Sequence, residues 1–376
     1  MLLPGTLAGS VMNDRPRKIK VCYVLSYHQP NYVRSLALLG LLRANNQFEV
    51  FEARNKTKGL LRYAQTILQL ILCRIKYRPD VYILGFRGYE IFLPVRILTI
   101  GKPLIYDEFI NLYDWFVLEH KKIKSDSFTA RLIMWYSRLT LKLSDSVVTD
   151  TSLNAEFSSR VHGLERTKFT HIYVGTDEAT FTPGNKKTPT KNLEVLFYGN
   201  MLPLHGVEHM LDAMRQLQDK PVHFTIIGGK KTKYETVIHQ FLNEHNLSNV
   251  TYKNWVPYHD LPTYIGAADL CLGGPFGGTS QASKVITGKT FQFLAMAKPV
   301  LIGHIDEEVG FVDGKNCLKI SQASEKQLRE KIVWAIQHRG ELEQIGLGGK
   351  RLYDEKFSKQ AQHQKLTDII AKVTRV

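Results

Sequence analysis

The stretch "LEVLFYGNMLPLHGVEHMLDAM", residues 193–214, decides the fold because it joins a strand, a loop and a helix. Its first residues are almost all apolar, as expected for a strand that is covered on both faces. A loop with Gly199 and Gly206 follows, and apolar residues then recur at helical spacing. The stretch therefore predicts one strand-loop-helix unit of a parallel sheet.

The same unit recurs along the chain in both directions. Strand-like runs that alternate with helical ones are found at residues 19–26, 80–86, 102–108, 145–150 and 169–175 before the stretch, and at 222–229, 249–255 and 269–274 after it. This alternation predicts an α/β fold with two Rossmann-like, doubly wound parallel-sheet domains. A ligand of such a pair is expected between the carboxyl ends of the two sheets.

Length and composition give the expected domain limits. The chain has 376 residues, of which 44% are hydrophobic, enough for two cores. Around residues 178–192 the apolar pattern gives way to Pro, Gly, Thr and Lys, which predicts a linker. We expect a disordered leader at 1–17, a first domain at 18–180, a linker at 181–191, a second domain at 192–355, and a C-terminal helix at 356–376 that crosses back to the first domain.

The net charge of +15 favours an anionic partner, which could be nucleic acid, a lipid surface or a phosphorylated small molecule. The four cysteines are widely scattered, without the close pairs of a zinc site, and fit a reducing cytosol. No run of about 18 uncharged apolar residues is present, so no transmembrane helix is expected.

Three loops that follow strands of the second domain are expected at one rim of its sheet. They are residues 198–206, 226–231 and 273–284, all with glycines. Backbone N–H groups in such loops, together with a helix N-terminus, can face an anion. None has the G-x-G-x-x-G spacing, which argues against a nicotinamide cofactor.

Several stretches together resemble the GT-B glycosyltransferases, and the second domain is similar to the retaining enzymes of glycosyltransferase family 4. They are "LFYGNMLPLHGVEHMLDAM", "FTIIGG", "VTYKNWVPYHDLPTYIGAADLCL", "GPFGGTSQASKVITGKTFQFLAMAKPVLIG", "LSDSVVTDTSLNAEF" and "IYVGTDEATFTP". The resemblance implies a nucleotide-sugar donor, with a UDP-sugar favoured, and transfer with retention.

The chain departs from the family pattern at two positions. The family's two glutamates, spaced by seven residues, fall on Lys284 and Gln292. The amide of Gln292 can still hold a ribose, because it both donates and accepts hydrogen bonds. Lys284 reverses the local charge. The basic residues that commonly follow the first strand of this domain become Asn200 and His205.

The resemblance implies a site in which cations and a helix N-terminus stabilise a departing diphosphate. The expected catalytic residues are Lys289, Lys284, His205 and Asp107. The expected donor contacts are Gly199, Asn200, Gly206, Gly228, Trp255, Val256, Phe276, Gly277, Gly278, Thr279, Thr290 and Gln292. The expected acceptor-side residues are His28, Arg87 and Glu108. No cofactor and no metal are expected, and the chain contains no Asp-x-Asp motif.

Plainer interpretations of these residues stand beside the functional ones. Lys289 could be a solvated lysine, Gln292 a helix-surface residue and Trp255 a packed aromatic. His28 and Asp107 could order loops by hydrogen bonds. The apolar residues of the same segment, Phe291, Phe293, Leu294, Met296 and Val300, are expected in the core.

Residues 54–78 hold seven basic residues and no acidic one. A helical face within them carries Leu60, Leu61, Ala64, Ile67, Leu68, Ile71 and Ile75. This combination is typical of a helix on an anionic membrane surface. The alternative, a core-packed crossover helix with a solvated basic face, is favoured by its place in the strand-helix alternation.

The sequence thus predicts a metal-independent glycosyltransferase that acts in the cytoplasm, at the inner face of the membrane, on a glycan or lipid-linked acceptor. The alternatives are a sugar-nucleotide epimerase of the same fold and a noncatalytic nucleotide- or nucleic-acid-binding protein. Nucleic acid is not the expected partner, because no base-stacking motif or groove-entering module is found.

Overall fold

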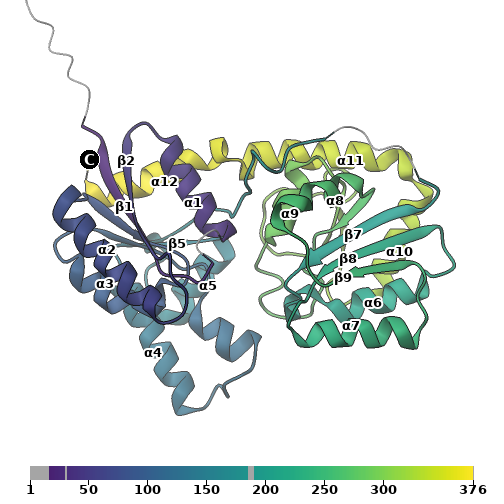
Figure 1. Cartoon of the computed structure of the whole chain (residues 1–376), viewed down its shortest axis with the longest axis horizontal. Helices are drawn as coiled ribbons and strands as arrows, with labels where there is room; N and C mark the ends of the chain where they lie inside the picture. The colour runs from purple at the N-terminus through teal and green to yellow at the C-terminus, as the bar shows by residue number, and fades with distance from the viewer. Residues whose placement is uncertain (1–16, 30–31, 185–189, 376) are drawn as a thin grey trace, which may run out of the picture.

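The computed structural model describes residues 17–29, 32–184 and 190–375, which form two α/β domains joined side by side (Figure 1). The predicted leader lies almost wholly outside the described residues, and so does the middle of the predicted linker.

The first domain holds a six-stranded parallel sheet with the order β2-β1-β3-β4-β5-β6. Its strands are β1 (Ile19–Leu25), β2 (Phe48–Arg54), β3 (Val81–Leu84), β4 (Leu104–Asp107), β5 (Ser146–Thr149) and β6 (Phe169–His171). Its helices are α1 (Val33–Ala44), α2 (Leu61–Tyr77), α3 (Phe92–Leu98), α4 (Phe128–Leu143) and α5 (Ser152–His162), with short turns at η1 (Gly88–Ile91), η2 (Asp114–Glu119) and η3 (Arg166–Lys168).

The second domain repeats this plan with the strand order β12-β11-β10-β7-β8-β9. Its strands are β7 (Leu193–Gly199), β8 (Val222–Gly228), β9 (Val250–Lys253), β10 (Leu270–Leu272), β11 (Val300–Gly303) and β12 (Leu318–Ile320). Its helices are α6 (Val207–Gln216), α7 (Lys233–Glu244), α8 (Leu261–Ala267), α9 (Gly288–Ala295), α10 (Glu325–Gln337) and α11 (Arg339–Leu352), with short turns at η4 (Pro203–His205) and η5 (Tyr258–Asp260). The predicted pair of doubly wound parallel sheets is confirmed.

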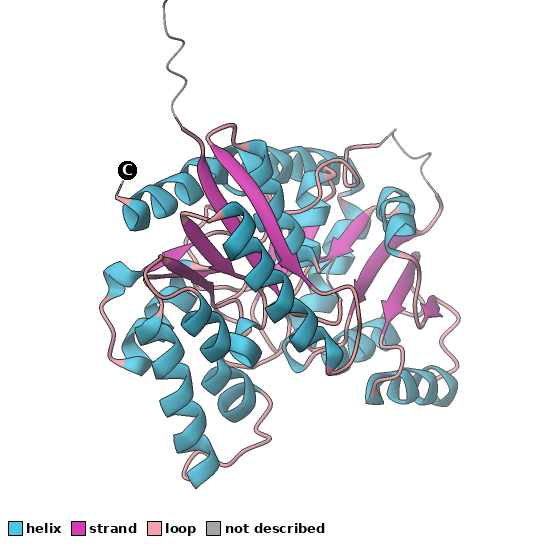
Figure 2. Ribbon diagram, turned by 60° about the vertical axis from the view of Figure 1, so that its left-hand side comes forward, coloured by secondary structure: helices cyan, strands magenta, loops and turns pink. Residues whose placement is uncertain are grey.

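Helices cover both faces of each sheet, as Figure 2 shows. In the first domain, α1 and the C-terminal α12 (Lys359–Thr374) pack on one face of the sheet, and α2, α3, α4 and α5 pack on the other. In the second domain, Phe291, Phe293 and Leu294 of α9 are buried in the core, as predicted, and so are Met296 and Val300.

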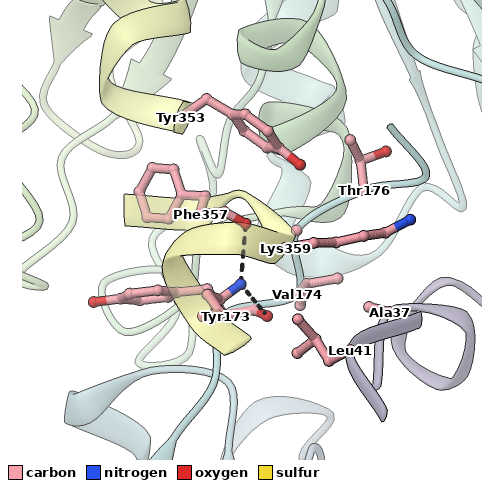
Figure 3. A pocket seen from close by; sticks show the side chains of 10 residues that line it. Ala37, Leu41, Tyr173, Val174, Thr176, Tyr353, Phe357 and Lys359 are labelled. Atoms are coloured by element: carbon pink, nitrogen blue, oxygen red, sulfur yellow. Dashed lines mark hydrogen bonds between the residues drawn. The ribbon is translucent and has the colours of Figure 1, made fainter. Parts of the chain in front are cut away.

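The chain returns from the second domain to the first through η6 (Tyr353–Phe357) and α12, which lies along α1 (Figure 1). At this crossing the Gln362 Nε2 donates to the carbonyl oxygens of Tyr173 and Phe357 at 3.1 and 3.0 Å. Figure 3 shows these bonds at a cavity of about 10 Å³ between α1, residues 173–176 and η6. The cavity has room for about one water molecule, so this crossing is tightly packed.

The apolar face predicted for α2 is turned outward. Leu61, Leu68 and Ile75 are exposed, as is Leu60 just before the helix, and the side chains that face the sheet include Leu70 and Cys73 instead. The favoured interpretation of α2 as a core-packed crossover helix is confirmed, because Leu70, Cys73 and Ile67 pack in the core on the sheet. Most of the predicted apolar face nevertheless lies in solvent. None of the helices in the described part of the chain has the length and hydropathy of a membrane span.

Two of the cysteines that are far apart in the sequence meet in the fold. Cys22 lies on β1 and Cys73 on α2, and their Sγ atoms are 3.2 Å apart as buried free thiols. The spacing of cysteines along the chain could not reveal this pair, because it depends on how α2 packs on the sheet.

Candidate active site

Three glycine-containing loops of the second domain meet backbone to backbone at the carboxyl ends of β7, β8 and β10. A Cβ on Gly228 would lie 1.9 Å from the carbonyl oxygen of Gly199, and one on Gly206 would lie 2.6 Å from the carbonyl carbon of Phe276. Both glycines also have positive φ angles, of 129° and 62°. Only glycine fits these positions, so the glycines bring the loops together.

Lys289, in the first turn of α9, reaches into the space beside these loops. It is 6% exposed, and its Nζ lies 4.8 Å from the ring centre of Phe197 and 3.6 Å from where a Cβ on Gly199 would be. Burial lowers the pKa of Lys289 to about 7, and no carboxylate contributes to that shift. The plainer interpretation of Lys289 as a solvated lysine is wrong, since its amine is desolvated.

His205 lies next to Lys289 and Gly199. Its Nδ1 accepts a hydrogen bond from the Leu202 N–H at 3.2 Å, which leaves the proton of the neutral ring on Nε2. Burial, followed by the positive charge of Lys289, holds the pKa of His205 well below its usual value. His205 is therefore a neutral donor beside a buried amine.

The start of α9 is held by hydroxyl groups. The Thr287 Oγ1 donates to the Gly273 carbonyl at 2.7 Å and lies 3.0 Å from the Thr290 Oγ1. These contacts fix the first turn of α9, which carries Lys289, against the loop after β10.

Gln292 lies one turn further along α9 and is enclosed by two tyrosines. Its Oε1 accepts a hydrogen bond from the Tyr198 hydroxyl, and its Nε2 lies 3.5 Å from the Tyr258 hydroxyl. The side chain is buried. The expectation of a helix-surface residue is therefore wrong, and the amide is fixed in position.

Trp255 and Val256 line a groove of about 370 Å³ beside the edge strand β9, together with His239, Tyr252, Lys253 and Asn254. Trp255 is 58% exposed, and Lys230 Nζ lies 5.2 Å from its ring. The interpretation of Trp255 as a packed aromatic is wrong. An exposed indole next to a cation offers a stacking surface for a flat ring.

The remaining residues predicted to contact the donor differ in their burial. Phe276 is a core side chain, so only its backbone borders the site. Gly277 packs against the Pro203 carbonyl oxygen, where a Cβ would lie 2.3 Å away. Asn200 and Gly278 are exposed, and Thr279 is half-buried.

Lys284 does not face the same space as Lys289. Its Nζ lies 2.8 Å from the Asp114 Oδ2 of the first domain and 3.7 Å from the ring centre of Phe157. The Thr151 hydroxyl, also from the first domain, donates to the Lys284 carbonyl at 2.8 Å. The positive charge of Lys284 is thus neutralised in a contact between the domains, which does not support its predicted role at the diphosphate.

Glu307 forms a second contact between the domains, which no motif in the sequence predicts. Its carboxylate accepts from the Ser152 and Leu153 N–H groups at 2.8 and 2.9 Å, and from the Tyr173 hydroxyl at 3.0 Å. Glu307 belongs to the second domain, and the N-terminus of α5 belongs to the first. The contact therefore combines hydrogen bonds with the attraction between the carboxylate and the dipole of α5.

The residues predicted on the acceptor side lie in two separate places of the first domain. Asp107 is fully buried, and its Oδ1 accepts from the Arg34 Nε and Nη2 at 3.0 and 2.7 Å. This buried pair connects the end of β4 with α1. Arg87 pairs with Glu90 at the end of the domain where His28 is exposed, and burial followed by the Arg87 charge lowers the pKa of His28.

Glu108 lies beside Asp107, at the carboxyl end of β4 and toward the second domain. Its Oε1 accepts from the Asn111 Nδ2 at 2.8 Å, and burial raises its pKa to about 8. Burial also raises the pKa of Asp150, at the end of β5, to about 6. Within the described ranges, no three His, Cys, Asp or Glu side chains are grouped to hold a metal ion.

Comparisons with known proteins identify a family match for part of the chain and the fold of the whole. Residues 192–338, less than half of the chain, match the family model described as Glycosyl transferases group 1. No curated protein matches the chain in sequence.

Solved structures match nearly the whole chain. HepE from Anabaena in complex with UDP-glucose is 14% identical with a TM-score of 0.69, covering 94% of this chain and 100% of that one. Sucrose-phosphate synthase from Thermosynechococcus elongatus is also 14% identical with a TM-score of 0.72, covering 95% and 100%. A glycosyltransferase from Rickettsia africae is 12% identical with a TM-score of 0.67, covering 95% and 98%. The second domain therefore matches a family of glycosyltransferases, and the chain as a whole has the GT-B fold.

Proposed function

We propose that the protein transfers a sugar from a nucleotide-sugar donor, with a UDP-sugar favoured, to a glycan or lipid-linked acceptor. The observation that carries the proposal is the buried amine of Lys289 at the positive end of α9, which has no carboxylate acting on it. A buried cation is costly until an anion reaches it. A diphosphate beside Gly199 supplies that anion.

The donor is placed by groups on both sides of Lys289. The Lys289 Nζ, the His205 Nε2–H and the first N–H groups of α9 donate to the diphosphate. Gln292 contacts the ribose with its fixed amide, and the exposed face of Trp255, with the Val256 backbone, contacts the base. HepE in complex with UDP-glucose, a structure of the same fold, supports the choice of a UDP-sugar.

We propose that transfer proceeds with retention, as the resemblance to family 4 implies, and without a nucleophilic side chain. The acceptor hydroxyl attacks the anomeric carbon from the side of the leaving group. The bond from that carbon to the diphosphate oxygen breaks, and the departing oxygen takes the hydroxyl proton. Lys289, His205 and the α9 N-terminus stabilise the charge that grows on the diphosphate, and in this proposal they fill the role that a metal ion has in other transferases.

The place of action that we propose is the cytoplasm, at the inner face of the membrane. The four cysteines are buried thiols, which fits a reducing compartment. Glycan synthesis there would supply the nucleotide-sugar and the lipid-linked acceptor.

A donor screen with UDP-, GDP- and ADP-sugars tests the proposal. With a UDP-sugar, we expect release of the nucleoside diphosphate and a product whose mass is increased by one sugar. The Lys289→Ala variant should lose most turnover, about a hundredfold or more, and Lys326→Ala, which changes an exposed lysine of α10, should keep it. An isomerised donor without transfer would identify an epimerase, and no turnover with any donor would contradict the proposal.

A further inference from the structure

Three neighbouring helices of the first domain carry apolar side chains on their outer surfaces. α3 contacts both α2 and α4, and the inner sides of all three cover the sheet. On the outer side the exposed apolar residues are spaced three, four or seven residues apart. They are Leu61, Leu68, Leu72 and Ile75 on α2, Leu93 and Ile97 on α3 with Ile100 just beyond it, and Phe128, Leu132 and Trp135 on α4.

The exposed apolar side chains of the first domain are concentrated on this surface and are not scattered over the domain. Every large exposed apolar side chain in the described part of the first domain lies between Leu60 and Leu143, on or beside these helices. In the second domain the corresponding side chains are distributed over several separate elements. Phe128 is 79% exposed and Trp135 59% exposed, so two large rings are mostly uncovered. Contiguous apolar patches of this kind mark interaction sites.

The charge of the same helices indicates which kind of partner this surface binds. α2, α3 and α4 contain no Asp or Glu. Of their seven basic residues, Arg62 pairs with Glu90 and Arg96 with Asp145. The other five are Arg74, Lys76, Arg131, Arg138 and Lys142. Just before α4, Lys121, Lys122 and Lys124 are exposed as well. Apolar residues interleaved with cations complement an anionic lipid surface, where the rings enter the boundary region and the cations meet the phosphates.

The same charge argues against a second copy of the chain as the occupant. Two such surfaces placed face to face would bring basic residues opposite one another, because the three helices contain no acidic residue and the neighbouring Glu90 and Asp145 already pair with Arg62 and Arg96. Figure 1 places α2 and α3 on the side of the first domain that is away from the second domain, so these two helices are not needed for contact between the domains.

We infer that the outer surface of α2, α3 and α4 docks on an anionic membrane, with Phe128 and Trp135 inserted among the lipid head groups. The surface begins beside the acceptor-side residues, because Arg62 of α2 and Arg87 both pair with Glu90. A lipid-linked acceptor held in that membrane reaches these loops. Only this last step rests on the proposed function; the docking itself requires no donor.

Vesicle flotation of the full chain without donor tests the inference. The probes are vesicles of phosphatidylcholine alone and vesicles with about one third phosphatidylglycerol. We expect binding to the anionic vesicles, weakened by salt, and little binding to the neutral ones. Phe128→Ser with Trp135→Ser should weaken binding on the order of tenfold, and Arg131→Glu with Lys142→Glu should weaken it by about fivefold for each residue.

Matched variants in the second domain serve as controls. Leu347→Ser changes an exposed apolar residue and Lys326→Glu an exposed lysine, and both should bind like the unchanged protein. Equal absence from both vesicle types, or equal binding by all variants, would overturn the inference. So would a soluble dimer that Phe128→Ser disperses, measured by light scattering. Loss of transfer with retained vesicle binding would overturn only the proposed function.

Discussion

The Nζ of Lys284 lies 2.8 Å from the Oδ2 of Asp114, and this buried ion pair joins the two domains across 170 positions of sequence. The resemblance to family 4 predicts a glutamate at the position of Lys284. The reversed charge is therefore matched by a carboxylate from the other domain, and the pair connects the loop before α9 with η2 of the first domain.

A double-mutant cycle measures this connection. Each single change, Lys284→Met or Asp114→Leu, leaves one buried charge without its partner and should cost about 3–5 kcal/mol of unfolding free energy. The double variant should recover most of that loss, because two apolar side chains replace the pair. Thermal unfolding midpoints and kcat/KM are the readouts.

The exposed pair of Lys331 and Asp313 is the control for this cycle. Lys331→Met should change the midpoint little, since exposed pairs contribute about 1 kcal/mol or less. Strictly additive losses in the cycle would mean that Lys284 and Asp114 do not act as a pair.

Glu307 offers a sharper test of the contact between the domains, because an exposed glutamate follows it. In Glu307→Gln, an amide N–H replaces a carboxylate oxygen and opposes the N–H groups of Ser152 or Leu153. We expect a loss of about 1.5–3 kcal/mol, as for hydrogen bonds to charged groups. Glu308→Gln should stay within about 0.5 kcal/mol of the unchanged protein. If Glu307→Gln and Glu308→Gln changed the thermal midpoint equally, the hydrogen bonds of Glu307 would not stabilise the contact between the domains.

The low pKa of Lys289 predicts how nucleotide affinity depends on pH. The pKa is about 7 in the free protein, and a bound diphosphate raises it. Binding therefore takes up a proton above about pH 7, so affinity for UDP should fall by up to about tenfold per pH unit there. Lys289→Met should remove this slope, and Lys326→Met should retain it. A flat profile for the unchanged protein would place the diphosphate away from Lys289.

Part of this molecule could be predicted from the sequence because it depends on local pattern. The alternation of strands and helices gave both sheets, and Gly288 and Lys289 ahead of an apolar run predicted a cation at a helix start. These features involve residues that are close together along the chain.

The rest depends on packing between distant segments. The pairs of Lys284 with Asp114 and of Asp107 with Arg34 join residues 170 and 73 positions apart. The outward apolar face of α2 was misjudged for a related reason. An amphipathic pattern shows that two faces of a helix differ in polarity, but it does not show which face contacts the sheet. In α2 that face is the one with Leu70 and Cys73.

The most direct test of the central claim is calorimetric titration of UDP into three proteins at about pH 7: the unchanged chain, Lys289→Met and Lys326→Met. The account predicts that UDP binds the unchanged chain and Lys326→Met equally, and binds Lys289→Met at least about tenfold more weakly. The Lys289→Met variant should also be more stable without ligand, because a desolvated charge is removed. Binding of UDP to Lys289→Met as tight as to Lys326→Met would contradict the account.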